Sequence, residues 1–357
     1  GFDSLVKDGS IDANFRLRAE TVSKDGKDDA LATTLKSRIT VKSGSVYGLS
    51  ALVEGDNTTH AIDDFNSSQN GNAEYNKVID PETTQFNQAY IQYVNAGSTV
   101  KAGNQRVNLD NQRHVGGVGF RQDEATFDAI SLVNTDIENT TIIAAFADNL
   151  NNIKDEDVEA DITLLNVKYQ LNPDLAATGF YYDVENFGST VGARVVGKTG
   201  GIGFEAEIAT QDQDATDASP LYYHLAANKK VASVKLTAGL EVLASDDGAS
   251  AFATPFGTNH KFLGWSDSYL TAADIGADGI QDLYATAVTK VAGVKLVGQL
   301  HKFDANDGST DKGSELGFLA AKKIKNYGVS LKLAQFNAGD DGKVDATKVW
   351  LTGTAKF

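Results

Sequence analysis

The sequence predicts an all-β fold: a transmembrane antiparallel β-barrel of about 18 strands, with short turns at one end and longer loops at the other. Apolar and polar residues alternate along short segments throughout the 357-residue chain. The connections between these segments alternate between short and long. No stretch approaches the ~18 consecutive apolar residues of a spanning helix, so a chain that crosses a membrane must pair its backbone in a closed barrel.

The alternation is clearest in residues 11–20, IDANFRLRAE, where Ile11, Phe15 and Leu17 share one face and Arg16 and Arg18 share the other. The same period of two recurs to the end of the chain, which predicts one barrel domain over residues 1–357. The predicted strands are 10–22, 31–43, 46–54, 85–95, 98–107, 124–134, 139–148, 161–171, 175–185, 189–198, 202–211, 219–228, 232–243, 282–292, 294–303, 314–324, 328–336 and 346–357.

The connections are sorted by length. Short ones such as 172–174 (NPD) alternate with longer polar ones such as 148–160, and 244–281 is the longest. Outer-membrane barrels have short periplasmic turns and longer extracellular loops, whereas a soluble β-sandwich has no reason to sort its connections in this way. A β-solenoid would show a fixed repeat, and the sequence shows none.

Composition and the chain ends add further expectations. The net charge of −16 argues against nucleic acid as a partner, and the absence of cysteine excludes disulfides and thiolate metal sites. The chain begins at Gly1, so we expect a mature form from which a signal peptide has been removed, located in the outer membrane of a Gram-negative bacterium. Phe357 ends an alternating strand and resembles the signal that the outer-membrane assembly machinery recognises. The expected surroundings are a lipid bilayer and lipopolysaccharide.

Cationic residues recur on the faces predicted to line the lumen. They are Arg16, Arg18, Lys36 and Arg38 on the early strands, and Arg194 on a later one. Cations along a pore attract anions, and arginine also binds carboxylates and phosphates with two hydrogen bonds. Alternatively, these cations neutralise inward acids such as Glu20 and Glu54 and only stiffen the wall. The two interpretations are compatible.

Residues 104–128, NQRVNLDNQRHVGGVGFRQDEATFD, form an unusual segment that carries Arg106, Arg113 and Arg121 among glycines. We expect residues 108–124 to fold inward as a constriction loop, since an exposed loop in such an acidic chain has little use for three arginines. The alternative is an exposed loop.

Residues 251–270, AFATPFGTNHKFLGWSDSYL, lie within the expected long extracellular loop 244–281 and are too aromatic for a plain solvated loop. They could form a lid, a surface on which sugars stack, or a packed cap. The candidate lid residues are His260, Lys261, Trp265 and Asp267.

These two segments, together with details of IDANFRLRAE, resemble the alginate-export family of outer-membrane proteins. The resemblance covers some 50 of the 357 residues. It implies a monomeric barrel of 18 strands with an arginine-lined pore that favours anions. It also implies that Arg106, Arg113 and Arg121 belong to the constriction and that 251–270 lies near the mouth. It does not establish alginate as the solute.

Other chemistry has little support. Residues 304–315 are rich in oxygen ligands, which makes Asp304, Asn306, Asp307 and Asp311 a weak candidate for loop-bound Ca²⁺, but the spacing does not fit an EF-hand. No nucleophile elbow or phosphate-binding loop is present, so we expect neither an enzyme nor a cofactor.

The sequence thus predicts a porin for passive diffusion of small hydrophilic solutes, favouring anions such as acidic sugars or other carboxylates. The alternatives are an outer-membrane receptor or adhesin, and a hydrolase with its site at the rim.

Overall fold

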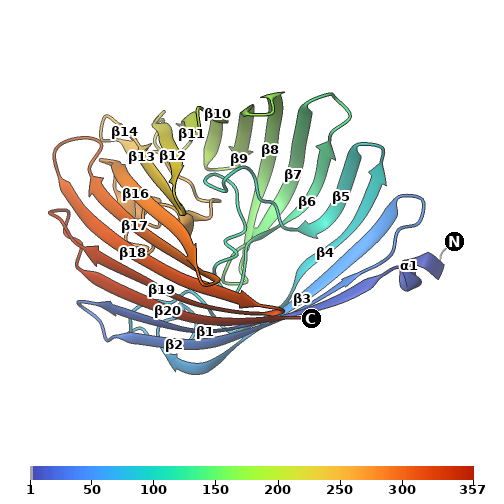
Figure 1. Cartoon of the computed structure of the whole chain (residues 1–357), viewed down its shortest axis with the longest axis horizontal. Helices are drawn as coiled ribbons and strands as arrows, with labels where there is room; N and C mark the ends of the chain where they lie inside the picture. Colours follow the sequence, from blue (N-terminus) through green and yellow to red (C-terminus); the bar gives the residue numbers. More distant parts are fainter. Residues whose placement is uncertain (1–2) are drawn as a thin grey trace.

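A computed structural model describes residues 3–357 as an antiparallel sheet of 18 strands closed into a barrel (Figure 1). Each strand pairs with its neighbours in the chain, and β20 pairs with β1 to close the ring. The strands are β1 (Ser10–Lys24), β2 (Ala30–Lys42), β3 (Leu49–Asp64), β4 (Thr83–Asn95), β5 (Ser98–Gln105), β6 (Thr126–Asn134), β7 (Thr140–Asn151), β8 (Asp157–Asn172), β9 (Leu175–Val184), β10 (Gly188–Thr199), β11 (Ile202–Gln213), β12 (Leu221–Val231), β13 (Val234–Leu243), β16 (Ile280–Val291), β17 (Val294–Asp304), β18 (Asp311–Ile324), β19 (Tyr327–Asn337) and β20 (Ala346–Lys356). Each predicted strand overlaps one of these, so the predicted fold class is confirmed.

The remaining elements are short. Helix α1 (Asp3–Lys7) precedes β1. The connection between β13 and β16 contains β14 (Ser245–Asp246), β15 (Ser250–Ala251), the 3₁₀ turn η1 (Asn259–Lys261) and α2 (Ala272–Ile275). No helix within residues 3–357 has both the length and the apolar character needed to cross a membrane.

The two ends of the barrel differ. At the end that we call the short-turn end, several hairpins close in two residues. Gly200 and Gly201, for example, both have positive φ, as a tight hairpin turn that follows the sheet twist requires. At the long-loop end, strands run further than predicted: β3 continues to Asp64 rather than ending at residue 54. There, both faces carry polar residues, so the alternation that marks a strand in the sequence disappears.

The two faces of the wall are chemically distinct. Outward residues are apolar and exposed, including Leu331 and Leu351, which oppose each other on β19 and β20. Their sequence neighbours point to the lumen, where Arg18 opposes Thr352 and Glu20 opposes Trp350. The main apolar core also lies inside the barrel, where connecting segments pack on the inner wall around Phe127, Ile162, Tyr182, Tyr222 and Phe252.

Candidate functional site

The segment between β5 and β6, residues 106–125, crosses the lumen; we call it the inner loop (Figure 1). On one side its carbonyl groups accept hydrogen bonds from β1: Arg18 Nη1 donates to Phe120 O at 2.6 Å, and Arg16 Nη1 donates to Gly119 O at 2.9 Å. On the other side Arg113 Nε donates to Glu241 Oε1 on β13 at 2.6 Å. The structure therefore places the predicted constriction loop inside the barrel.

Residues 251–270, which we call the aromatic segment, pack directly against the inner loop. The backbones join where Gly116 N donates to Phe256 O at 2.8 Å and Thr258 N donates to Gln112 O at 2.9 Å. A Cβ at Gly116 would lie 2.4 Å from Thr258 Oγ1, so this close approach requires glycine. The segments are far apart in sequence but form one body inside the barrel.

An ion-pair network joins the inner loop to β2 and β3. Arg38 pairs with Asp56 at 2.6 Å and with Glu124 at 2.5 Å, and Arg106 pairs with Glu124 and with Glu54. Lys36 lies 3.2 Å from Asp56. Burial alone would raise the pKa of Glu124, but its bonds with Arg106 and the field of Arg38 lower that pKa to about 2. The carboxylate is thus ionised and neutralises part of the cationic wall.

Arg121 is a buried cation of the inner loop that is surrounded by acids. It lies 2.9 Å from Glu20, 3.4 Å from Asp80 and 3.6 Å from Asp267. These acids raise its pKa against the effect of burial. Arg121 therefore holds the inner loop in place and exposes little charge to the lumen.

Arg16 and Arg18 differ from Arg121, because neither forms a salt bridge with any residue in the described part of the chain. Arg16 Nε donates to Gln122 Oε1 at 2.8 Å, and its other donors reach carbonyl groups. Arg18 lies over the Phe120 ring at 4.2 Å and donates to Thr352 Oγ1. Two guanidinium groups thus lie on β1 without a carboxylate in direct contact, Arg16 partly exposed and Arg18 buried.

His260 links the aromatic segment to the wall. Its Nδ1 bonds to Asp267 Oδ1 at 2.6 Å, its Nε2 bonds to Lys332 Nζ at 2.6 Å, and its ring stacks on Phe120 at 3.8 Å. Burial lowers the pKa of His260 to about 4, so the ring is neutral and accepts from the ammonium. Asp267 also binds Lys348 at 2.8 Å.

The candidate lid residues are therefore not gathered over the mouth. His260 and Asp267 face β19 and β20 within the barrel, and the backbone of Trp265 donates to Glu315 on β18. Lys261 lies on the other side of the segment, where its Nζ donates to Asn111 O of the inner loop at 2.9 Å. The apolar character of the segment serves packing inside the lumen.

The opposite wall holds a second set of charges. Arg194 on β10 pairs with Glu205 at 2.7 Å and with Glu207 at 3.2 Å, and His114 bonds to Glu207 at 2.6 Å. The predicted pore-lining residues are thus divided between two sides of the barrel, and the inner loop contacts both.

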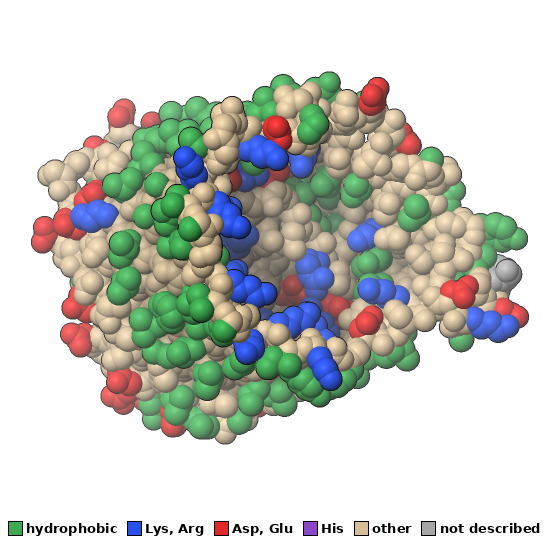
Figure 2. Space-filling view, viewed as in Figure 1, with side chains coloured by type: hydrophobic (Ala, Val, Ile, Leu, Met, Phe, Trp, Pro, Cys, Tyr) green, Lys and Arg blue, Asp and Glu red, His purple; other side chains and the backbone are tan. Residues whose placement is uncertain are grey.

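Two cavities lie between the inner loop and the short-turn end. One, of about 510 Å³, is lined by Lys42, Lys101 and Arg106 together with Asp12 and Glu54. The other, of about 500 Å³, is lined by Lys168, Arg194 and Lys198 with Asp110 and Asp174. Figure 2 shows Lys and Arg side chains gathered around the central hollow of the barrel.

The four candidate calcium ligands do not gather into one metal site. Asp304 and Asp311 both bind the ammonium group of Lys302, at 2.9 and 2.6 Å, and Asn306 Oδ1 accepts from Ser245 N. Across residues 3–357, no group of three or more acidic or histidine side chains is placed to hold a metal ion.

Sequence reasoning missed several members of the site. Lys332 and Lys348 lie at alternating positions of their strands, VSLKLAQ and TKVWL, and could have been assigned to the lumen in the same way as Arg16. Asp80 could not have been assigned to the lumen from the sequence, because it lies in a long connection without periodicity. It reaches the inner loop by accepting from Gln122 N at 2.7 Å.

Comparison with known proteins shows the fold. No protein-family model matches the chain, and no curated protein sequence does. Among solved structures, Pseudomonas aeruginosa OpdO matches with a TM-score of 0.78 at 14% identity, over 99% of this chain and 98% of that one. P. aeruginosa OccK9 (OpdG) matches with a TM-score of 0.79 at 12% identity, over 99% of this chain and 100% of that one. Acinetobacter baumannii OccAB2 matches with a TM-score of 0.76 at 14% identity, over 99% of each chain.

These neighbours are Occ/OprD channels, not alginate-export proteins and not enzymes, so the resemblance to the alginate-export family is wrong. The two segments that suggested it are the segments that pack together inside the lumen. Arginine, glycine and aromatic residues are what such packing needs, so this composition does not identify a family.

Proposed function

We propose that the chain is a bacterial outer-membrane porin that lets small hydrophilic solutes diffuse passively and favours anions. The observation that carries this proposal is the pair of guanidinium groups at Arg16 and Arg18, which lie beside the inner loop without a salt bridge to any residue between 3 and 357; Arg16 is partly exposed and Arg18 is buried behind it. Uncompensated cations at a narrow, partly dehydrated place raise the local concentration of anions and lower that of cations.

The outer surface supports the location. Leucine, valine and isoleucine side chains are exposed around the barrel, and aromatic residues gather near the short-turn end: Tyr47, Tyr93, Tyr169, Tyr327 and Phe357. An apolar band flanked by aromatic residues matches a bilayer and its interface. By this arrangement the short-turn end faces the periplasm, and the long loops face outward among lipopolysaccharide.

The closing strand fits assembly in that membrane. Phe357 and Ala13 exchange backbone hydrogen bonds at 2.8 and 2.9 Å, and the Phe357 ring contacts Phe15 and Tyr327. Recognition of Phe357 by the assembly machinery is part of the same proposal.

Planar-bilayer recording across a KCl gradient tests the function, with Arg16→Gln and Arg16→Lys as a matched pair. Both variants lose the planar guanidinium that binds Gln122 and two carbonyl groups, but only the glutamine variant loses the charge. We expect an anion-selective reversal potential that Arg16→Lys retains and Arg16→Gln shifts toward zero. Cation selectivity of the unmodified channel would contradict the anion preference, and absence of conductance would favour a receptor.

A further inference from the structure

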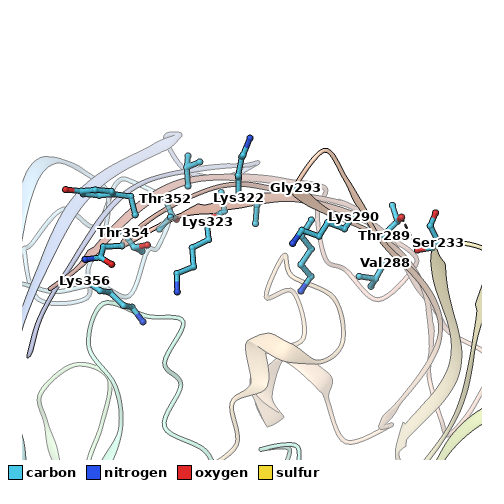
Figure 3. Close-up of a pocket in the computed structure, with 17 residues that line it drawn as sticks. Ser233, Val288, Thr289, Lys290, Gly293, Lys322, Lys323, Thr352, Thr354 and Lys356 are labelled. Atoms are coloured by element: carbon cyan, nitrogen blue, oxygen red, sulfur yellow. Dashed lines mark hydrogen bonds between the residues drawn. The ribbon is translucent and has the colours of Figure 1, made fainter.

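Six lysines lie on the lumen face near the short-turn end, on the arc of wall from β12 to β20: Lys230, Lys235, Lys290, Lys295, Lys323 and Lys356. The strand register fixes their side of the wall. Lys356 opposes Asn14, which is on the same face of β1 as the lumen residue Arg16. Val297 opposes Leu319, and Leu319 opposes the lumen residue Lys332. Lys295 is two residues before Val297, so it also faces the lumen. In Figure 3, Lys290, Lys323 and Lys356 extend to one side of the wall and Lys322 to the other.

This arc contains no acid. Residues 221–240, 283–303, 316–337 and 346–357 include no Asp or Glu, although the chain has 48 of these against 32 Lys and Arg. All six lysines are exposed, and none forms a salt bridge with a residue between 3 and 357. They therefore differ from the cations near the inner loop, most of which have carboxylate partners.

The lysines also oppose one another. Lys230 lies directly across from Lys235 on β12 and β13, and Lys290 lies directly across from Lys295 on β16 and β17. Like charges at opposed positions of an antiparallel pair destabilise the sheet. Two such pairs, with Lys323 on the next strand, make a site where a bound anion would offset the repulsion.

A groove accompanies the lysines. It has a volume of about 670 Å³ and is lined by Lys290, Lys295, Lys323 and Lys356, with the hydroxyl-bearing residues Ser330, Thr352 and Thr354 (Figure 3). No acidic residue lines it. The volume is within the ~300–1,000 Å³ of ordinary ligand pockets. Lysine binds phosphate as a mobile point charge, and hydroxyl groups donate to phosphate oxygens.

We propose that this groove binds solutes that carry two or more phosphate groups, at a site separate from the inner loop. Several flexible ammonium groups without competing carboxylates favour a ligand with many charges and variable spacing over a single carboxylate. The site lies on β16–β20 and depends on neither Arg16 nor Arg18, so it goes beyond the proposed ion preference.

The test is calorimetric titration of the detergent-purified barrel with inorganic tripolyphosphate at low salt. We expect binding that weakens as salt rises and that falls about tenfold or more in the combined variant Lys290→Gln, Lys295→Gln, Lys323→Gln. The matched control removes as many charges at the long-loop end, with Lys27→Gln, Lys77→Gln and Lys154→Gln, and should bind like the unmodified chain. Electrophoresis in SDS verifies that each variant is folded, because a folded barrel changes its mobility on the gel after it is heated.

Equal weakening in the two combined variants would overturn the proposal, because it would mean attraction by overall charge. Failure of the unmodified barrel to bind would also overturn it. Equal affinity for tricarballylate, which carries three carboxylates, would overturn the assignment to phosphate. A cation-selective channel would contradict the proposed function yet leave the calorimetric result standing, so the two failures are distinguishable.

Discussion

At the residue scale, burial decides which charges of the lumen can act on a passing solute. Arg18, Arg113 and Arg121 are buried, whereas the side chain of Arg106 is 30% exposed and Arg16 is partly exposed and forms no salt bridge within residues 3–357. From the sequence, all five were equivalent candidates for an anion filter. All five contact the inner loop or belong to it, and the structure separates the three buried cations from Arg16 and Arg106, which keep some exposure to the lumen.

Asp123 offers a pH-dependent contribution to that charge. Its side chain is buried in the inner loop, where Oδ1 accepts from Gln85 and Glu124 N, and burial raises its pKa to about 7. We expect anion preference to increase as pH falls from 8 to 6, because protonation removes a negative charge beside the lumen cations. Reversal potentials over this range measure the change, and Asp123→Asn should keep high anion preference throughout. Identical pH profiles for the two proteins would exclude Asp123 as the titrating group.

The same group carries a stability consequence. The pKa of Asp123 is about 4 in the unfolded chain and about 7 in the folded barrel. Ionisation of this carboxyl therefore opposes folding, and the barrel loses stability as pH rises from about 4 to about 7. Asp123→Asn should therefore stabilise the barrel at pH 8 more than at pH 4.

At the scale of elements, the sequence predicted strands well and connecting segments only in part. Strands such as β1 and β20 alternate because lipid and lumen demand opposite side chains. The inward path of residues 108–124 followed from an excess of arginine. The place of residues 251–270 did not follow, because their aromatic composition suits a lid and a buried packing partner equally. Only the contact of Gly116 with Thr258 and Phe256 distinguishes the two.

The junction of the inner loop with β13 depends on one buried ion pair. Arg113 and Glu241 have side chains 1% and 3% exposed, and Arg113 also donates to Thr254 and Asn259 of the aromatic segment. Replacing only Arg113 by methionine leaves the Glu241 carboxylate buried without its cation, which should cost about 3–5 kcal/mol. Thermal unfolding followed by circular dichroism measures the loss.

The double variant Arg113→Met, Glu241→Gln is the control, because it removes both charges. It should recover a large part of the lost stability, and its conductance should show whether the inner loop still narrows the lumen. If the single and double variants are equally unstable, the ion pair is not what joins this loop to the wall.

At the scale of the whole molecule, charge is sorted along the barrel axis. The long-loop end carries exposed acids, among them Asp28, Asp63, Glu156, Asp217 and Asp247. In contrast, lysines are the only charged residues on the wall from β12 to β20 near the short-turn end. The net charge of −16 therefore adds together two ends that carry opposite charges. It does not give the charge that a solute meets inside the barrel.

This asymmetry predicts rectification. Fixed charges of opposite sign at the two mouths accumulate anions at one and cations at the other, so ions should cross more readily under one polarity of voltage than under the other. The effect depends on screening, whose length falls from about 10 Å in 0.1 M salt to about 3 Å in 1 M. Single-channel current–voltage curves should therefore be asymmetric at the lower concentration and nearly symmetric at the higher one. Removing Lys290, Lys295 and Lys323 should reduce the asymmetry, and removing Lys27, Lys77 and Lys154 at the long-loop end should not. A symmetric curve in dilute salt would mean that mobile ions, or the narrow region at the inner loop, outweigh the charge at the mouths.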